Sequence, residues 1–359
     1  MHGLLIAGGG TGGHIYPAVA IVQAVKRINP KTEVDFAGTA KGLETKIIPR
    51  ENFPLHLIKI GPLNNVGFFT KLWTLLSLPL AVYDSMRLIL KLKPKIIMGV
   101  GGYASGPVMV AGVLLKPFLK LKLAIFEANA FPGLTNRWLS RFVSVSFTNF
   151  EISNVYFKNP ITVGIPVREG LTPVSRLPSE RLRVLIFGGS QGARGINITV
   201  TEAVKLGGDW LNNVEFVHQL GSTDFHKFDN LYKELKPKNI KWFEFLYDMP
   251  DRYSWADVVV CRAGASTLAE LAACQKAATL IPFPYASDNH QEKNAQAIAE
   301  ENAAKVILQK DFTPDSFRNW IQDLIENKNL IPAYEKSISK FFKPKSAERI
   351  AEYLLENLQ

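Results

Sequence analysis

The sequence predicts an α/β protein made of two doubly wound domains, each built on a parallel sheet. Short apolar runs that end in a glycine loop and lead into a helical pattern recur along the chain, and strands that alternate with helices form parallel sheets. The chain also has 359 residues, which is more than one hydrophobic core usually organises. The repeated units begin at Leu4, Ile96, Val184 and Val258. The first and third begin half a chain apart, so each is predicted to open its own domain.

The first unit is predicted to be a strand, a glycine loop and a helix. Leu4–Ala7 is apolar, Gly8–Gly13 reads Gly-Gly-Gly-Thr-Gly-Gly, and Ala18–Val25 has helical spacing. Pro17 is expected in the first helical turn, where its missing N–H costs nothing. This segment lacks the basic start of a signal peptide, so none is predicted.

The second unit includes 20 uncharged residues, Ile96–Leu115, which is nominally enough to span a bilayer. Its five glycines and Pro107 instead indicate a buried strand, a glycine loop and a helix. No transmembrane segment is therefore predicted.

A connection rich in proline and glycine, Ile161–Pro178, separates the two halves. We expect a first domain over residues 1–163, a second over 164–340, and a C-terminal helix over 341–359 that could pack back on the first domain. Ligands of doubly wound sheets bind at the carboxyl ends of the strands. The glycine loops of both domains are therefore expected to face one cleft.

The composition is that of an ordinary globular protein, with 47% hydrophobic and 21% charged residues. The cysteines, Cys261 and Cys274, are too few for a disulfide framework, which favours a reducing compartment. The net charge is +10, and most of it lies between Lys59 and Arg141, where eleven basic residues accompany two acidic ones. Such a local excess suits an anionic partner or a solvated face.

An apolar helical stripe lies within this basic segment. An apolar stripe with flanking lysines is typical of a protein that lies on an anionic membrane. A core helix with incidental basic residues is the alternative. Nucleic acid is not favoured, because stacking aromatics would be interleaved with the basic residues, and here they form a separate run. The residues predicted to associate with the membrane are Phe68, Phe69, Leu72, Trp73, Lys91, Lys93 and Lys95.

The first glycine loop fits two chemistries. Gly8, Gly10 and Gly13 follow a strand as G-x-G-x-x-G, and Asp35 comes 22 residues later, which is a formal dinucleotide fingerprint. An NAD(P)- or flavin-dependent oxidoreductase is therefore one hypothesis. His14 is unusual for that motif, and it either hydrogen-bonds the helix start or presents an imidazole to a ligand.

Two further loops could bind an anion or a nucleotide. Gly188–Gly195 lacks the Lys-Ser/Thr ending of a P-loop, but its glycines, Ser190 and the following helix could hold a phosphate. Thr267 and Glu270 have the spacing of a capping box. Glu270 could close the helix start in that way, or it could accept hydrogen bonds from a ribose.

Six sequence blocks, taken together, resemble the MurG family of bacterial peptidoglycan glycosyltransferases, which have the GT-B fold. The blocks follow the family order and cover both predicted domains. They are Gly-Gly-Gly-Thr-Gly-Gly-His-Ile-Tyr-Pro-Ala from Gly8, Gly-Val-Gly-Gly-Tyr-Ala-Ser-Gly-Pro from Gly99, Pro-Gly-Leu-Thr-Asn-Arg from Pro132, Gly-Gly-Ser-Gln-Gly-Ala-Arg from Gly188, Arg-Ala-Gly-Ala-Ser-Thr-Leu-Ala-Glu from Arg262 and Asp-Asn-His-Gln-Glu-Lys-Asn-Ala from Asp288.

The resemblance implies an inverting hexosyltransferase that uses UDP-N-acetylglucosamine (UDP-GlcNAc). The sugar would pass to the C4 hydroxyl of N-acetylmuramic acid in lipid I, the undecaprenyl-diphosphate-linked muramyl pentapeptide, and give lipid II. The resemblance also implies a peripheral enzyme on the cytoplasmic face of the bacterial inner membrane, without a cofactor. Its protein partners could include cell-wall synthesis or division proteins.

The family pattern puts substrate-binding residues in both domains. They are Thr11, Gly12, Gly13, Asn129, Arg168, Ser190, Leu246, Ala265, Ser266, Thr267, Leu268, Ala269, Glu270 and Gln291. The chain departs from the family at Phe126 and Ala128, where His and Gln are usual, so acceptor contacts of those two side chains are not expected here.

An inverting displacement needs a base for the attacking hydroxyl and a sink for charge on the departing UDP. A free imidazole has a pKa of about 6.5, so His14 is the first candidate for the base, with Glu127 as its rival or partner. Helix N-termini and Ser190 could act as the sink, and no cluster of carboxylates indicates a metal. The oxidoreductase and a non-catalytic UDP-sugar-binding protein remain the alternatives.

Overall fold

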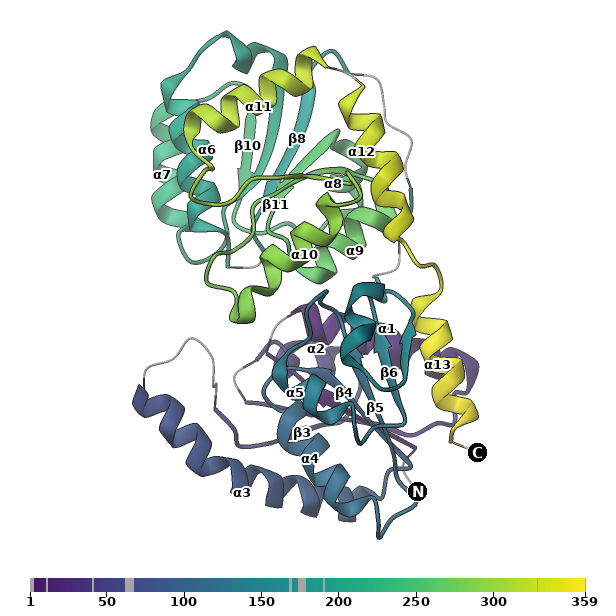
Figure 1. Ribbon diagram of the computed structural model, residues 1–359. Coiled ribbons are helices and arrows are strands. Elements are labelled where there is room, and N and C mark those ends of the chain that lie inside the picture. The colour runs from purple at the N-terminus through teal and green to yellow at the C-terminus, as the bar shows by residue number, and fades with distance from the viewer. Residues whose placement is uncertain are drawn as a thin grey trace. The chain divides into compact units, whose positions relative to one another are not determined.

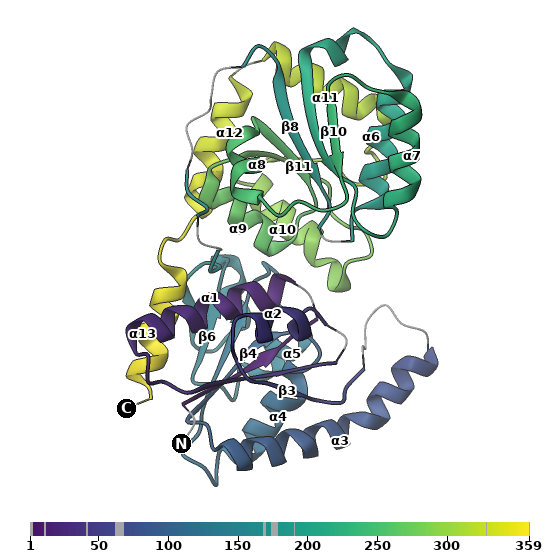
Figure 2. The same ribbon diagram turned by 180° about the vertical axis from the view of Figure 1, so that it is seen from behind.

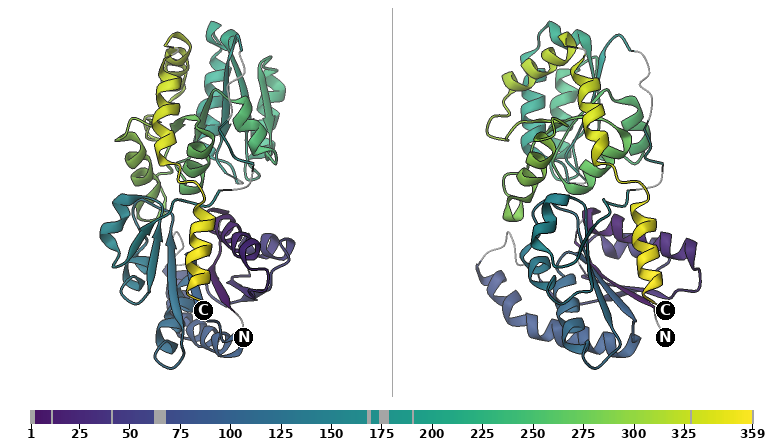
Figure 3. Two further views of the ribbon diagram at one scale, coloured as in Figure 1. Left: turned by 90° about the vertical axis from the view of Figure 1, so that its right-hand side faces the viewer. Right: turned by 45° about the vertical axis from the view of Figure 1, so that its right-hand side comes forward.

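Each half of the chain builds a parallel sheet with helices on both faces in this computed structural model (Figure 1 and Figure 3). The structure describes residues 3–10, 12–40, 42–61, 68–167, 170–173, 179–189, 191–327 and 329–358, and only the backbone of residues 68–72 and 75. The chain divides into two units, Met1–Arg168 with Lys343–Gln359, and Glu169–Phe342. The last helix of the chain therefore belongs to the first unit.

The first unit contains a seven-stranded sheet in the order β3-β2-β1-β4-β5-β6-β7, with parallel neighbours throughout. The strands are β1 (Leu4–Gly8), β2 (Val34–Gly38), β3 (Leu55–Leu57), β4 (Ile96–Gly101), β5 (Lys122–Glu127), β6 (Val145–Thr148) and β7 (Pro160–Thr162). The helices are α1 (Gly12–Ile28), α2 (Glu44–Arg50), α3 (Phe68–Leu92), α4 (Ser105–Leu115), α5 (Leu134–Leu139), the 3₁₀ helix η1 (Glu151–Tyr156) and α13 (Ser346–Glu356).

Helix α1 starts earlier than predicted. It begins at Gly12, so Pro17 is its sixth residue, and the expectation that Pro17 lies in the first turn is wrong. Proline has no N–H to donate to the carbonyl of Gly13, four residues before it. The helix nevertheless continues through Pro17, because buried side chains such as Ile15 and Ile21 pack it on β1 and β4.

Helix α13 lies beside α1 (Figure 2). Near its start, Arg27 Nη2 lies 3.1 Å from Glu348 Oε1. At its end, Lys122 Nζ donates to the Asn357 carbonyl at 3.0 Å, and Lys95 Nζ donates to the Leu358 carbonyl. Lysines at this end of a helix interact favourably with the negative end of its dipole.

The second unit contains a six-stranded sheet in the order β10-β9-β8-β11-β12-β13, again with parallel neighbours. The strands are β8 (Leu182–Phe187), β9 (Val214–Gln219), β10 (Ile240–Phe243), β11 (Val258–Cys261), β12 (Ala277–Leu280) and β13 (Lys305–Val306). The helices are α6 (Arg194–Leu206), η2 (Asp209–Asn213), α7 (Phe225–Leu235), α8 (Met249–Trp255), α9 (Ala265–Cys274), η3 (Ser287–Asn289), α10 (His290–Ala299), α11 (Pro314–Glu326), α12 (Leu330–Ile338) and η4 (Ser339–Phe341). The doubly wound parallel sheets predicted from the sequence are confirmed in both units.

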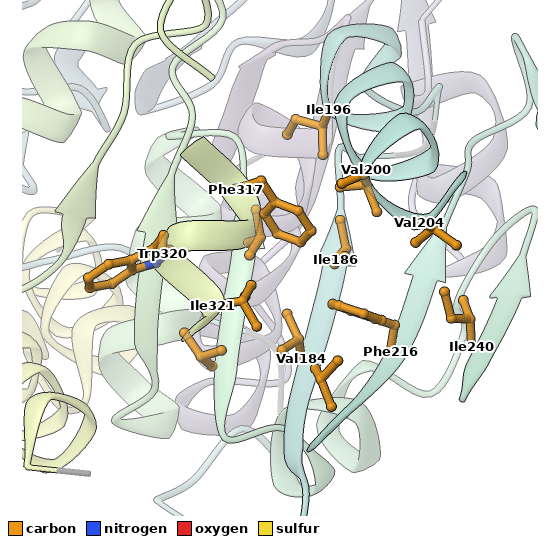
Figure 4. Close-up of a cluster of buried hydrophobic side chains, with 14 of the residues drawn as sticks. Val184, Ile186, Ile196, Val200, Val204, Phe216, Ile240, Phe317, Trp320 and Ile321 are labelled. Carbon is orange, nitrogen blue, oxygen red and sulfur yellow. The ribbon is translucent and has the colours of Figure 1, made fainter. Parts of the chain in front are cut away.

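One face of the second sheet is covered by α6 and α11 (Figure 4). Alternate residues Val184 and Ile186 of β8 point to this face. Ile196, Val200 and Val204 recur every four residues along α6 and meet Phe216 of β9 and the α11 side chains Phe317, Trp320 and Ile321 in one buried cluster. The indole N–H of Trp320 donates to Thr279 Oγ1 at 2.7 Å, so its polar atom is satisfied within the core.

A neutral histidine lies under this cluster. His218 is fully buried, its Nε2 lies 3.1 Å from Asn197 Oδ1, and its Nδ1 lies 2.8 Å from the Tyr232 hydroxyl. Asn197 Nδ2 donates to the Leu220 carbonyl, so Oδ1 is the acceptor and Nε2 carries the proton. Burial lowers the pKa of His218 from 6.5 to about 3.

The free energy of unfolding of the second unit should therefore fall as the pH drops below 6.5. Below pH 6.5 the unfolded chain binds a proton on His218, whereas the folded chain keeps this side chain neutral down to about pH 3. The contribution of His218 to the free energy of unfolding is therefore complete above pH 6.5 and is lost as the pH falls toward 3. Between pH 6.5 and pH 5 the expected loss is about 2 kcal/mol. Urea unfolding, followed by the fluorescence of Trp210, Trp242 and Trp320, would measure it. In His218→Gln this part of the pH dependence should disappear, and identical pH profiles for both proteins would contradict the assignment.

Candidate active site

In both sheets the strand order reverses beside the central strand, between β1 and β4 in the first unit and between β8 and β11 in the second. At such a point the connections leave on opposite faces of the sheet, so a ligand can reach the carboxyl ends of the strands. The four glycine loops predicted from the sequence follow these four strands. Each unit thus has two glycine loops at its expected ligand-binding edge.

In the first unit the two glycine loops touch each other. The N–H of Gly9 donates to the carbonyl of Gly101 at 3.2 Å. Gly102 has a φ of +84°, and a Cβ on this residue would collide with the Gly9 backbone. A Cβ on Gly8 would lie 2.8 Å from the Gly101 carbonyl oxygen. Only glycine allows the backbones of the two loops to approach this closely.

A buried carboxylate binds the glycine loop that follows β1. Glu44, at the start of α2, is 1% exposed. One of its oxygens accepts from the N–H of Gly10 at 2.8 Å. The other accepts from the N–H and the hydroxyl of Thr39 at 2.9 and 2.8 Å. A Cβ on Gly9 or Gly42 would overlap this carboxylate, so the loop is built around an internal anion.

His14 lies in the first turn of α1, above Gly101. A Cβ on Gly101 would lie 2.8 Å from Cδ2 and 2.9 Å from Nε2 of the imidazole. Nδ1 lies 3.3 Å from the Gly9 carbonyl, which can only accept, so Nδ1 carries a proton. In the neutral ring Nε2 is then the basic nitrogen. This hydrogen bond of the imidazole therefore goes to the glycine loop and not to the helix start, and it fixes the tautomer. The predicted Gly12 and Gly13 are the first two residues of the same helix.

Asp35 does not take the place that a dinucleotide-binding site requires. It is the second residue of β2, buried, and its Oδ1 lies 2.8 Å from Nε2 of His56 on β3. In addition, the N–H of Gly10 is bound to Glu44. The acidic residue of the fingerprint thus pairs within the sheet, three residues before the strand ends, and the oxidoreductase hypothesis loses its structural basis.

Glu127 ends β5 and is surrounded by donors. Its Oε1 accepts from the N–H and the side-chain amide of Asn129, both at 3.0 Å. Its Oε2 accepts from Asn136 Nδ2 at 2.9 Å and from the N–H of Gly133 at 3.3 Å. Burial raises the pKa of Glu127, and these hydrogen bonds oppose that shift. The carboxylate therefore fixes Asn129 and the loop that leads into α5.

Strand β4 lies between β1, which leads into the helix that carries His14, and β5, which ends at Glu127. Neighbouring strands are spaced by about 4.8 Å, so β1 and β5 are about 10 Å apart. Both residues lie at the carboxyl edge of the sheet, and the hydrogen bonds of Glu127 come from Asn129, Gly133 and Asn136, so the two candidate bases are not bonded to each other.

In the second unit a buried side-chain amide binds the Gly188–Gly195 loop, which the sequence predicts to hold a phosphate and which is called the phosphate-type loop below. Gln219, at the end of β9, is 4% exposed. Its Oε1 accepts from the N–H of Gly188 at 3.4 Å, and its Nε2 donates to the Gly189 carbonyl at 2.9 Å. The loop then leads into α6, whose N-terminus presents backbone N–H groups. Ser190, Thr11 and Arg168 lie outside the described residues.

Glu270 does not form the capping box that its spacing allows. Helix α9 has Gly264 as its N-cap, with no side-chain capping bond, and Glu270 follows in the second turn. The capping interpretation is therefore wrong, because the helix begins two residues before Thr267. The carboxylate instead accepts the hydroxyl of Tyr253 from α8 at 2.9 Å.

The other residues of the second unit predicted to bind the UDP-sugar lie at the start of α9, in the segment after β10 and at the start of α10. Ala265 and Leu268 are buried, so a ligand could contact only their backbone, whereas Ser266, Thr267 and Ala269 are partly exposed. Leu246, after β10, is also buried. Gln291, in the first turn of α10, accepts from the N–H of Phe283 at 3.0 Å.

The predicted membrane segment is the helix α3, which packs beside α4 (Figure 1). The side chains of Phe68, Phe69 and Leu72 lie outside the described residues. Trp73 is 74% exposed, and Leu76, Leu80 and Tyr83 continue an exposed stripe at helical spacing. Lys91 and Lys93 are exposed, and Lys95 binds the end of α13. No described helix is long and apolar enough to cross a membrane.

Sequence reasoning missed Glu44, Gln219 and Tyr253. Each is a buried polar residue with a partner that is distant in sequence. The bond between Glu44 and Gly10 spans 34 residues, those of Gln219 to Gly188 and Gly189 span 31 and 30, and that between Tyr253 and Glu270 spans 17. No local spacing marks such a pair. Among the described residues, no group of three His, Cys, Asp or Glu side chains is placed to hold a metal ion.

Comparison with known proteins identifies the family. Models of the glycosyltransferase family 28 N-terminal and C-terminal domains match residues 4–148 and 183–350. A relative from Bdellovibrio bacteriovorus, named UDP-N-acetylglucosamine–N-acetylmuramyl-(pentapeptide) pyrophosphoryl-undecaprenol N-acetylglucosamine transferase, is 45% identical over 98% of each chain. The crystal structure of MurG from Acinetobacter baumannii is 28% identical, covers 99% of this chain and 100% of its own, and superposes with a TM-score of 0.78. The chain belongs to the MurG family.

A second MurG-family relative, of the same name and from Myxococcus xanthus, is 40% identical over 98% of this chain and 92% of its own. The resemblance seen in the six sequence blocks is therefore confirmed, as is the glycosyltransferase class. The two Rossmann-like sheets are those of the GT-B fold expected for the MurG family.

Removing the internal anion of the first glycine loop should destabilise the first unit. Glu44→Ala leaves the N–H groups of Gly10 and Thr39 and the Thr39 hydroxyl without their acceptor, and the expected loss of unfolding free energy is about 3 kcal/mol. Urea unfolding, together with faster amide hydrogen exchange in residues 34–50, would report it. Glu51→Ala is the matched control, because Glu51 is half-buried and accepts from Gln23 Nε2. Equal losses in both variants would contradict the special role of Glu44.

Proposed function

We propose that this protein transfers GlcNAc from UDP-GlcNAc to the C4 hydroxyl of the muramyl sugar in undecaprenyl-diphosphate-linked muramyl pentapeptide. The observation that carries the proposal is the 45% identity, over 98% of each chain, with a relative named for this transfer. The architecture supports it, because both units have glycine loops at the edge where doubly wound sheets bind ligands.

The donor nucleotide is assigned to the second unit. The N-termini of α6 and α9 follow glycine loops, and their backbone N–H groups suit the diphosphate of UDP-GlcNAc. These groups, with Ser190 and Arg168, stabilise the negative charge that builds up on UDP as it departs. Glu270 accepts hydrogen bonds from the ribose hydroxyls. The site around the uracil base and the sugar is completed by Leu246, Gln291 and the residues Ala265 to Ala269.

The acceptor is assigned to the first unit, with His14 as the base. Nε2 of His14 removes the proton from the C4 hydroxyl, and the oxygen attacks the anomeric carbon of GlcNAc. The bond from that carbon to the diphosphate oxygen breaks, and UDP leaves with the electron pair. Attack opposite the leaving group converts the α-linked donor sugar into a β-linked product. Gly12 and Gly13 begin the same helix, and Thr11, which precedes them in the chain, is assigned to the acceptor as well.

Glu127 is assigned a positioning role beside this reaction. All four of its described hydrogen bonds come from groups that it fixes in place, including both bonds to Asn129. A carboxylate that gives up these bonds to take a proton would release Asn129 and Asn136. The arrangement therefore favours Asn129, held by Glu127, as the group that contacts the acceptor, and His14 as the base.

The membrane surface is assigned to α3. The acceptor carries a polyprenyl chain that stays in the bilayer, so the first unit must work at the lipid surface. The exposed stripe of Trp73, Leu76, Leu80 and Tyr83 can enter the interface, and Lys91 and Lys93 can meet anionic headgroups. We assign the protein to the cytoplasmic face of the inner membrane, as a peripheral enzyme.

A transfer assay with UDP-GlcNAc and a short-chain lipid I analogue tests the function. Formation of the β-linked disaccharide product is expected, and it should continue in excess EDTA because helix N-termini take the charge of UDP. Tight UDP binding without any transfer would support the non-catalytic alternative and contradict the proposal.

The base assignment predicts that His14→Ala lowers kcat by about 100-fold or more, since general-base catalysis typically contributes that much. Donor affinity should change little, because His14 belongs to the first unit. His226→Ala, which removes an exposed histidine from α7, is the control and should keep the wild-type kcat. A nearly unchanged kcat in His14→Ala, with loss of turnover in Glu127→Gln, would move the base to Glu127.

The membrane assignment predicts separate apolar and electrostatic effects. Trp73→Ser with Leu76→Ser should weaken binding to both neutral and anionic vesicles by about tenfold or more, because the lost burial does not depend on charge. Lys91→Glu with Lys93→Glu should weaken binding to anionic vesicles only and reduce its salt sensitivity. Vesicle sedimentation measures both effects. Leu206→Ser, at a residue of α6 that is 66% exposed, is the control. Unaltered binding of both variants would mean that α3 does not meet the membrane.

A further inference from the structure

The carboxylate assigned to the ribose is held from inside the protein. The hydroxyl of Tyr253 donates to Glu270 Oε2 at 2.9 Å. Tyr253 comes from α8, which precedes β11, whereas Glu270 is on α9, which follows it. The contact thus joins the two helices that flank β11 in the chain.

Tyr253 is fixed by its own packing. It is 0% exposed, and its ring meets Phe187 edge-to-face, with the centroids 6.2 Å apart. Phe187 is the last residue of β8, directly before the phosphate-type loop. Burial and the nearby Glu270 raise the pKa of Tyr253 well above its ordinary value, so the hydroxyl stays protonated and acts as the donor.

We propose that Tyr253 is a positioning residue for donor binding, whose buried hydroxyl holds one oxygen of Glu270 so that the carboxylate is ready to accept the ribose hydroxyls. The inference rests on the proposed function, in which Glu270 binds the ribose of UDP-GlcNAc.

The physical reason is the freedom of a glutamate side chain. Ordering it on binding costs conformational entropy, and a side chain that is ordered beforehand avoids this cost. A hydrogen bond to a charged group from a buried donor is also stronger than one from water-exposed groups. Tyr253 can supply both effects without touching the nucleotide.

The test compares UDP with 2′,3′-dideoxy-UDP, which lacks both ribose hydroxyls. The wild-type protein is expected to bind UDP about 100-fold more tightly than the dideoxy compound, and Tyr253→Phe should narrow that ratio to about tenfold. The KM for UDP-GlcNAc should rise with kcat unchanged, because the interaction serves donor binding and not the chemical step. In the Glu270→Ala background, Tyr253→Phe should have no further effect on the ratio.

Tyr232→Phe is the matched control. Tyr232 is another fully buried tyrosine of the second unit, and its hydroxyl lies 2.8 Å from His218 Nδ1. This variant should keep the wild-type binding ratio even where its melting temperature falls as much as that of Tyr253→Phe. If it narrows the ratio equally, the effect is a general loss of stability, and the inference fails.

Two further outcomes separate the inference from the assignment beneath it. If the wild-type protein discriminates and Glu270→Ala abolishes the discrimination, but Tyr253→Phe keeps it in full, only the positioning role of Tyr253 is wrong. If the wild-type protein does not distinguish the two nucleotides, the ribose assignment of Glu270 fails, and the inference fails with it.

Discussion

Direct contact between two glycine backbones governs the first unit. Strands β1 and β4 are neighbours at the point where the sheet reverses its order, so the loops that follow them must leave from the same place. They fit because Gly8 and Gly102 have no side chains in the way. The imidazole of His14 lies on the bare backbone of Gly101 in the second of these loops. A side chain on Gly8 or Gly102 would push the loops apart, and one on Gly101 would displace that imidazole.

Buried polar groups then hold each loop or functional side chain in one arrangement. Glu44 binds the first glycine loop, and Gln219 binds the corresponding loop of the second unit. Glu127 fixes Asn129, and Tyr253 reaches Glu270. In each pair the inner group is almost fully buried, where an unpaired polar atom would be costly and where hydrogen bonds are least disturbed by water. The outer groups are therefore ordered by the protein itself, which leaves less entropy to be lost when substrates bind.

Much of the fold could be predicted from the sequence, because its elements are marked by patterns of residues close together in the chain. The strand starts, the glycine loops and the helix within residues 68–76 all follow from local periodicity and from glycine or proline positions. Predictions failed where a local pattern had a competing explanation: Pro17 lies inside α1 because packing outweighs one lost hydrogen bond, and Glu270 bonds Tyr253 in place of capping α9. Asp35 had the spacing of a ribose ligand, but its direction is set by His56 on the next strand. Pairs such as Glu44 with Gly10 depend on tertiary contacts that no local spacing encodes.

The position of α13 has a consequence for how the protein is made. The first unit needs residues from both sides of the second, because α13 packs beside α1 and is bound by Lys95 and Lys122. The second unit can complete its fold from one continuous segment, whereas the first sheet receives its final helix only from residues that follow the second unit in the chain. The first unit, to which the lipid surface is assigned, therefore cannot be complete before the second unit has been synthesised.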